Sequence, residues 1–254
     1  MEAYNRLALV YDLFMDNVPY EKWTKEMVEI FHSYGIYGGI VADLGCGTGG
    51  FTQSLALEGY DMIGIDNSLE MLDIAMEKKA RLGLDILYLC QDMQDFELYG
   101  TCRAIISRCD SLNYLIREED FLQTLKWVNN YLDPGGIFIF DVNSPYKYAH
   151  LLGERVIAEN REEASFIWEN HFDPERELNE YALTLFIKEG KGYQKSEEIH
   201  VQRSYSLEKI QQMAGEAGLI WEKALDADTL EEIKEDTGRY LIIVRENGKE
   251  AAHE

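Results

Sequence analysis

The sequence predicts a doubly wound α/β protein with a mostly parallel β-sheet covered by helices on both faces. From residue 40 onward, short apolar runs alternate with helix-length segments, which is the rhythm of repeated βαβ units. The runs are almost continuously apolar, as in strands that are buried on both faces. The 254 residues are 46% hydrophobic, enough to build one large domain or one domain with an insertion.

Two short helices are expected at the N-terminus. Apolar residues recur at helical spacings within residues 4–34, but Pro19 interrupts the run. We therefore place a bend at residues 16–19.

Five strands and three helices should follow. The strands are predicted at 40–44, 62–65, 86–90, 104–107 and 137–140, and the helices between them at 50–58, 69–81 and 118–132. Asn67 and Glu70 form a plausible capping pair for the second of these helices, and Gly83 follows it. Residues 133–136, Asp-Pro-Gly-Gly, are a turn signal before the fifth strand.

Residues 151–205 interrupt this rhythm. β-Branched and aromatic residues with partial alternation predict three antiparallel strands, at 164–172, 178–188 and 193–205. A helix at 207–217 and two strands at 219–224 and 240–244 complete the chain. We expect a core at 35–150 and 206–248, with residues 151–205 as an antiparallel β insertion.

The loop after the first strand carries the most informative motif. Gly45, Gly47 and Gly50 satisfy the pattern G-x-G-x-x-G, in which glycines permit a tight turn and a close approach to a ligand. A glycine-rich turn without a ligand is the alternative. Asp43 precedes the glycines, and its carboxylate would repel a pyrophosphate but suit an ammonium group. The loop therefore favours a ligand with an amino-acid head.

Acidic residues also end the next two strands. Asp66 lies 21 residues beyond Gly45, where a carboxylate commonly accepts hydrogen bonds from two ribose hydroxyls. Its alternative role is to cap the following helix. After the third strand, Asp92 could accept an adenine amino group while Met93 covers the ring.

In this order, the motifs resemble those of class I S-adenosylmethionine-dependent methyltransferases over about residues 35–245. Asp-Leu-Gly-Cys-Gly-Thr-Gly at 43–49 is among the specific signatures of that family. The resemblance implies a Rossmann-like core with a seven-stranded sheet in the order 3-2-1-4-5-7-6, the last strand antiparallel. It implies S-adenosylmethionine as cofactor, with these contacts: Asp43 near the methionine amino group, Gly45 and Gly47 under the methionine, Asp66 on the ribose, and Asp92 and Met93 at the adenine.

The N-terminus resembles the cofactor lid of small-molecule methyltransferases, including the glycine N-methyltransferase type. The similarity lies in residues 4–12 and 20–23, so we expect residues 1–34 to be a helical lid. Tyr11 and Trp23 are the aromatics expected to close over the methionine end. The alternative is that both are core residues on amphipathic helices.

The acceptor should bind beyond the carboxyl ends of the first and fourth strands, where the strand order switches. Cys109 should face the sulfonium there, unless it is only a buried packing residue. The substrate-side candidates are Asp110 and Asn113 after the fourth strand, and Asn143 and Tyr146 at the end of the fifth.

The insertion adds further candidates. Segments 144–147, 167–168 and 200–205 together resemble a subfamily of bacterial methyltransferases, a likeness that supplies no substrate. Trp168 and Arg203 are candidates for substrate binding, and His171 or His200 for a base that removes the acceptor's proton. Structural histidines, and an insertion that serves as a dimerisation surface, are the alternatives.

Composition limits the partners. With 47 acidic and 24 basic residues the net charge is −23, which disfavours nucleic acid, and no apolar run approaches a membrane span. No secretion signal, CxxC pair or metal-ligand spacing is present, which favours reduced cysteines in the cytoplasm and no metal.

The sequence therefore predicts a cytoplasmic enzyme that methylates a small neutral or cationic molecule by in-line displacement. The alternatives are a nicotinamide-dependent dehydrogenase and a non-catalytic S-adenosylmethionine-binding protein. Asp43 and the antiparallel end of the sheet disfavour the dehydrogenase.

Overall fold

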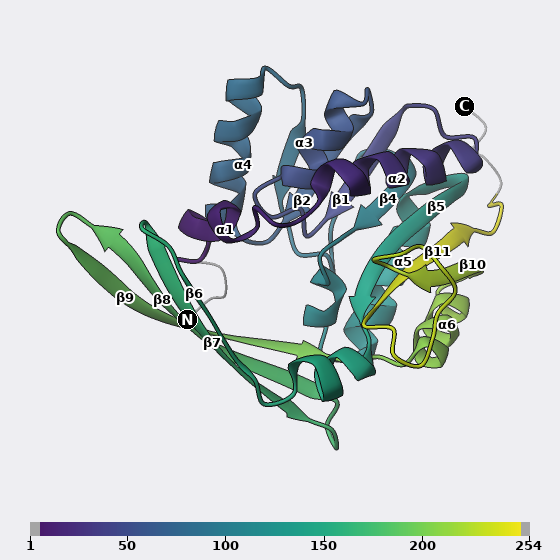
Figure 1. The fold of residues 1–254 in the computed structure, drawn as a ribbon. Helices are drawn as coiled ribbons and strands as arrows, with labels where there is room; N and C mark the ends of the chain where they lie inside the picture. Colours follow the sequence, from purple (N-terminus) through teal and green to yellow (C-terminus); the bar gives the residue numbers. More distant parts are fainter. Residues whose placement is uncertain (1–5, 250–254) are drawn as a thin grey trace.

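The computed structural model describes residues 6–249, and a seven-stranded sheet forms its centre (Figure 1). The strand order is β3-β2-β1-β4-β5-β11-β10, and β11 runs antiparallel to both of its neighbours while the other pairs are parallel. The strands are β1 Ile40–Leu44, β2 Asp61–Asp66, β3 Leu87–Cys90, β4 Cys102–Ser107, β5 Leu132–Asn143, β10 Leu219–Asp226 and β11 Arg239–Glu246. Numbered within this sheet alone, the order is 3-2-1-4-5-7-6, as predicted.

Helices cover both faces of the central sheet, which confirms the doubly wound fold. Two separate apolar clusters form, one under the helices Glu118–Tyr131 and Leu207–Glu216 and the other under the helices Tyr20–Ser33 and Gly50–Leu57. The helices that follow the strands are α3 Gly50–Leu57, α4 Leu69–Leu82, α5 Glu118–Tyr131 and α6 Leu207–Glu216. None of the helices described between residues 6 and 249 is long and apolar enough to cross a membrane.

Two local expectations need correction. The cap of α4 is Ser68, whose hydroxyl accepts the Met71 N–H at 3.2 Å, so the capping residue lies one position after Asn67. β5 also begins before the expected turn. Residues 133–136 form an irregularity within the strand, since the register with β4 shifts there.

The N-terminal segment forms the two predicted helices, α1 Ala8–Phe14 and α2 Tyr20–Ser33, with Pro19 immediately before α2. α2 packs on the central sheet, whereas α1 packs on the insertion. Figure 1 shows α1 between α4 and the insertion strands.

The insertion is a four-stranded antiparallel sheet that extends to one side of the core (Figure 1). Its strands are β6 Val156–Asn160, β7 Ala164–Asp173, β8 Leu178–Glu189 and β9 Gly192–Arg203. The sequence predicted three strands and missed β6, because this short edge strand is mostly exposed and lacks the alternation of a half-buried strand. A short π-helix, η2 Lys147–Leu152, connects the core to the insertion.

The register of the insertion decides which side chains share a face. His200 on β9 pairs with Tyr181 on β8, and both side chains are buried. The adjacent pair along the two strands, Val201 and Glu180, points to the opposite face of the sheet. The even-numbered positions of β7 and β9 therefore face α1 and the core. The odd-numbered positions, including His171 and Arg203, occupy the outer face.

Candidate functional site

A cavity of about 670 Å³ lies at the carboxyl ends of β1, β2 and β4. Its wall is formed by the loop after β1, the start of α4, the loop after β4, and Tyr11 and Tyr20 from the N-terminal helices. This is where ligands bind in open α/β sheets, at the switch in strand order.

The glycine loop brings backbone to the cavity wall. Gly45 has a φ of +71°, and a Cβ there would lie 2.6 Å from Cβ of Ser111. Gly47 has a φ of +53° and no atom within 4 Å of its Cβ position, so the backbone is open to a ligand. Only glycine satisfies both the backbone and the space at Gly45.

Asp43 lies in the cavity wall but is only 3% exposed. Its carboxylate accepts a hydrogen bond from the Thr52 hydroxyl at 2.6 Å. Burial raises the pKa of Asp43 to about 7, although the Thr52 bond opposes that shift. A carboxyl in this state is suited to pair with a ligand cation, which would favour its charged form.

Asp66 holds the neighbouring turns together and also lines the cavity. One carboxylate oxygen accepts the Gly47 N–H at 2.8 Å and the other accepts the Ser68 N–H at 2.9 Å. Burial nevertheless raises the pKa of Asp66 above its usual value. A carboxylate has about four lone-pair sites, so these two bonds leave capacity for ribose hydroxyls.

Of the adenine-side candidates, only Met93 lines the cavity, together with the neighbouring Gln91. Asp92 is not part of this wall, and its carboxylate accepts the Gln94 N–H at 2.9 Å. The structure thus gives Asp92 a turn-forming contact.

The two lid candidates differ. Tyr11 lines the cavity, whereas Trp23 does not. The Trp23 side chain is buried between two guanidinium groups, with Arg108 4.7 Å and Arg239 4.8 Å from the ring centroid. Because Arg108 itself lines the cavity, Trp23 contacts the site through that arginine.

The loop after β4 brings Cys109 to the cavity wall and leaves Asp110 behind it. Both residues adopt positive φ values, 60° and 52°. Burial raises the pKa of Cys109 to about 12, so the thiol stays protonated and is a poor nucleophile. The Asp110 carboxylate accepts a 2.7 Å hydrogen bond from the Gln202 amide, which ties this loop to the insertion.

Asn113 and Asn143 are buried where the loop after β4 meets the ends of β5 and β9. The Asn113 side chain accepts the Asn143 N–H and donates to the Arg203 carbonyl, both at 2.8 Å. The Asn143 side chain accepts from Lys147 Nζ at 2.7 Å. Tyr146, half-buried, has its ring centroid 4.9 Å from that of His150. None of these candidates is part of the cavity wall.

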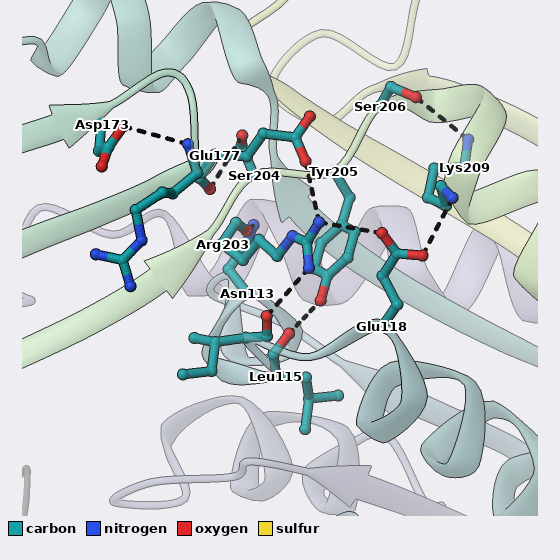
Figure 2. A network of polar contacts seen from close by, with 12 residues as sticks. Asn113, Leu115, Glu118, Asp173, Glu177, Arg203, Ser204, Tyr205, Ser206 and Lys209 are labelled. Atoms are coloured by element: carbon teal, nitrogen blue, oxygen red, sulfur yellow. Dashed lines mark hydrogen bonds and ion pairs between the residues drawn. The ribbon is translucent and has the colours of Figure 1, made fainter.

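The outer face of the insertion holds two of the remaining candidates. His171 is exposed and forms an ion pair with Glu154 at 2.8 Å. Figure 2 shows Arg203 paired with Glu118 and Glu177, at 3.0 and 3.1 Å. These contacts link the insertion to α5, and neither side chain reaches the cavity wall.

The inner face of the insertion lies closer to the site. Trp168 packs on Tyr181 with ring centroids 4.6 Å apart and is not part of the cavity wall. His200 is 2% exposed, and its Nδ1 lies 3.0 Å from the hydroxyl oxygen of Tyr114. Tyr114 does line the cavity, so His200 is one hydrogen bond away from it.

Sequence reasoning did not select Tyr20, Arg108, Ser111 and Tyr114, which all line the cavity. Position could have identified Arg108, because it immediately follows β4 at the strand-order switch. Tyr114 lies one short 3-10 helix further on, η1 Ser111–Tyr114, which has no distinctive sequence pattern.

Known proteins resemble this chain over nearly its whole length. A family model described as a methyltransferase domain matches residues 41–136. YqeM of Bacillus subtilis (strain 168), named as a methyltransferase, is 34% identical over 216 residues, which are 85% of each chain.

Solved structures agree in fold. An S-adenosylmethionine-dependent methyltransferase from Clostridium acetobutylicum is 30% identical with a TM-score of 0.87, covering 97% of this chain and 100% of that one. S-adenosylmethionine-bound CalS10, an amino pentose methyltransferase from Micromonospora echinaspora, is 14% identical, with a TM-score of 0.74 and coverage of 97% and 98%. Together with the glycine loop and with Asp43 and Asp66 beside one cavity, the similarity to YqeM and to the Clostridium acetobutylicum enzyme shows that the chain belongs to the class I S-adenosylmethionine-dependent methyltransferases.

Proposed function

We propose that this methyltransferase acts on a small-molecule acceptor bound in the same cavity as its cofactor. The observation that carries the proposal is the cavity wall, where the glycine loop meets Tyr11 and Tyr20 of the N-terminal helices and Tyr114 of the loop after β4. A site covered by the chain's own helices admits a small molecule more readily than a macromolecular surface. CalS10, which shares the fold, acts on an amino pentose.

The cofactor contacts follow from charge and position. Asp43 would hold the ammonium group of the methionine, Arg108 its carboxylate, and Asp66 the ribose. Met93 would cover the adenine. The cofactor supplies a methyl group already activated by a sulfonium, so the protein mainly aligns the acceptor and excludes water. Tyr11 and Tyr20 would present aromatic faces to that cation.

The acceptor is proposed to be neutral or cationic. The chain carries a net charge of −23, which repels anions in general and a phosphate backbone in particular. Nucleic acid is therefore not the proposed substrate.

We further propose a cytoplasmic protein that can form a homodimer. All four cysteines are free, in keeping with a reducing compartment. The outer face of the insertion exposes apolar side chains at Val156, Ile167 and Ile199, against which a second copy could pack. Sedimentation velocity should show a dimer that Ile199→Lys dissociates, and a monomer at all concentrations would contradict this.

Calorimetry and a methylation screen test the proposed function. S-adenosylmethionine and S-adenosylhomocysteine should bind specifically, and more tightly than a nicotinamide dinucleotide. Mass spectrometry should then detect a mass increase of one methyl group in a member of a panel of primary amines, amino sugars and alcohols. Specific cofactor binding without methylation of any panel member would reject the small-molecule acceptor and favour a non-catalytic binding protein.

A further inference from the structure

We propose that Tyr114, His200 and Glu198 form a proton relay that removes a proton from the nucleophile of the acceptor. The acceptor is then an amine or a hydroxyl compound rather than a tertiary amine or a thioether, which have no proton to lose. This inference rests on the small-molecule methyltransferase proposed above, since it concerns the acceptor side of the same cavity.

The relay runs from the cavity into the insertion. Tyr114 lines the cavity, and its hydroxyl oxygen lies 3.0 Å from Nδ1 of His200. On the other side of the ring, Nε2 lies 3.4 Å from a carboxylate oxygen of Glu198, within ion-pair distance but without the geometry of a hydrogen bond. The side chains of His200 and Glu198 are each 2% exposed, so bulk water does not separate the two groups.

The chemistry of the partners sets the direction of the relay. A carboxylate attracts an N–H group and repels the lone pair of an imidazole nitrogen, so we place the hydrogen of the neutral imidazole on Nε2, on the side of Glu198. Nδ1 is then an acceptor, and the Tyr114 hydroxyl donates to it. A phenol oxygen that donates its own hydrogen can still accept one from a ligand. In the proposed relay, Tyr114 takes a proton from the acceptor as it passes its own to His200.

The N-terminal segment holds the far end of the relay. One Glu198 oxygen accepts the backbone N–H groups of Arg6 and Leu7, at 2.8 and 3.0 Å. The segment that leads into α1 thereby fixes the group that orients His200.

Titratable groups from three elements face His200. They are Tyr114 from η1, Tyr181 from β8 and Glu198 from β9 itself. The Tyr181 and His200 rings are stacked, with their centroids 5.7 Å apart. His171 also lies in the insertion, but on the outer face with Glu154. The inner and outer histidines thus provide a matched pair for mutation.

The reaction balances as a proton-coupled displacement. The lone pair of the acceptor nitrogen or oxygen forms a bond to the methyl carbon, and the methyl–sulfur bond breaks with its electron pair left on sulfur. The methylated nucleophile releases its proton to the Tyr114 oxygen. The Tyr114 proton moves to Nδ1 of His200, and the resulting imidazolium faces the Glu198 carboxylate.

Steady-state kinetics with the primary amine or alcohol from the panel that the wild type methylates test the relay. Tyr114→Phe and His200→Gln should each lower kcat by about 10²-fold, the usual scale for loss of a general base. The KM of the acceptor and the affinity for S-adenosylhomocysteine should change by less than about threefold. His171→Gln should leave all three values unchanged. A Tyr114→Phe enzyme that folds and keeps kcat within twofold of the wild type would overturn the relay.

A second measurement needs no acceptor and no turnover. Nitrogen-15 NMR of the histidine rings in the cofactor-free protein should show the His200 hydrogen on Nε2, and its Nδ1 signal should move in Tyr114→Phe but not in Tyr60→Phe. Tyr60 is a buried tyrosine outside the cavity whose hydroxyl donates to the Ile36 carbonyl. A hydrogen on Nδ1 would exclude proton transfer from Tyr114 and overturn the inference, even if the enzyme methylates small molecules. A panel without turnover would instead reject the proposed function.

Discussion

Single side chains in this site make structural contacts in addition to the ligand contacts proposed for them. Asp66 shows the combination most clearly, because its two oxygens already accept the N–H groups of Gly47 and Ser68. The two functions that the sequence offered as alternatives, supporting the start of α4 and binding a ribose, are therefore compatible in one carboxylate.

We predict that Asp66→Ala weakens binding of S-adenosylhomocysteine by about 1.5–3 kcal/mol, the scale for hydrogen bonds to a charged group. This corresponds to a loss of affinity of roughly tenfold to 150-fold, measurable by calorimetry. Loss of the two backbone contacts should also lower the melting temperature, while the far-UV circular dichroism stays that of a folded protein. A folded variant with unchanged affinity would remove Asp66 from the cofactor site.

In the insertion, the alternation of side chains between the two faces of the sheet decides which residues lie near the cavity. Neighbouring positions along a strand lie on opposite faces, so His200 and Arg203 are separated although only two residues stand between them. The inner face contributes His200 to the surroundings of the cavity. The outer face ties Arg203 to α5 through Glu118 (Figure 2).

We therefore predict that Arg203→Ala lowers stability but leaves the acceptor's KM and kcat within about twofold. The two ion pairs are partly exposed and each is worth only about 0–1 kcal/mol, so denaturant unfolding should show a modest loss. Glu177→Gln removes only one of the two ion-pair partners of Arg203, so it should lower the free energy of unfolding by less than Arg203→Ala does. A clear rise in the acceptor's KM in Arg203→Ala would instead support the substrate-binding role expected from the sequence.

At the scale of the whole molecule, buried acids link stability to pH. Asp43 has its pKa raised to about 7, and burial also raises the pKa values of Asp66 and Asp110. For a carboxyl with a raised folded-state pKa, the folded protein binds its proton more tightly than the unfolded chain does. The resulting stability is fully present below the ordinary pKa, about 4, and is lost as pH rises through the folded value.

We predict that the melting temperature of the cofactor-free protein rises as the pH is lowered from 8 to about 5.5. Partial neutralisation of a chain with a net charge of −23 acts in the same direction. Asp43→Asn should reduce this pH dependence of the melting temperature between pH 5.5 and 7.5. Saturating S-adenosylhomocysteine should also reduce it, because the ammonium group of the ligand would favour ionised Asp43. Differential scanning calorimetry provides the measurement, and an equal pH dependence in wild type and Asp43→Asn would contradict the assignment.

The sequence by itself determined the central sheet, its strand order by resemblance, and the glycine loop with Asp43 and Asp66 beside it. These features are local, since apolar runs, turn residues and one contiguous motif encode them, and parallel strands must place their carboxyl ends at one edge. The sequence did not predict β6, because an exposed edge strand needs no alternation of apolar and polar residues.

Only the tertiary structure decided the acceptor side. Whether His171 or His200 faces inward depends on the register of β7 and β9 against the core, and one residue of shift would exchange the faces. Trp23 lies between Arg108 and Arg239, three residues from distant parts of the chain, so no local pattern could place it. Long-range contacts of this kind arise from packing between elements, and they decide which side chains reach the cavity.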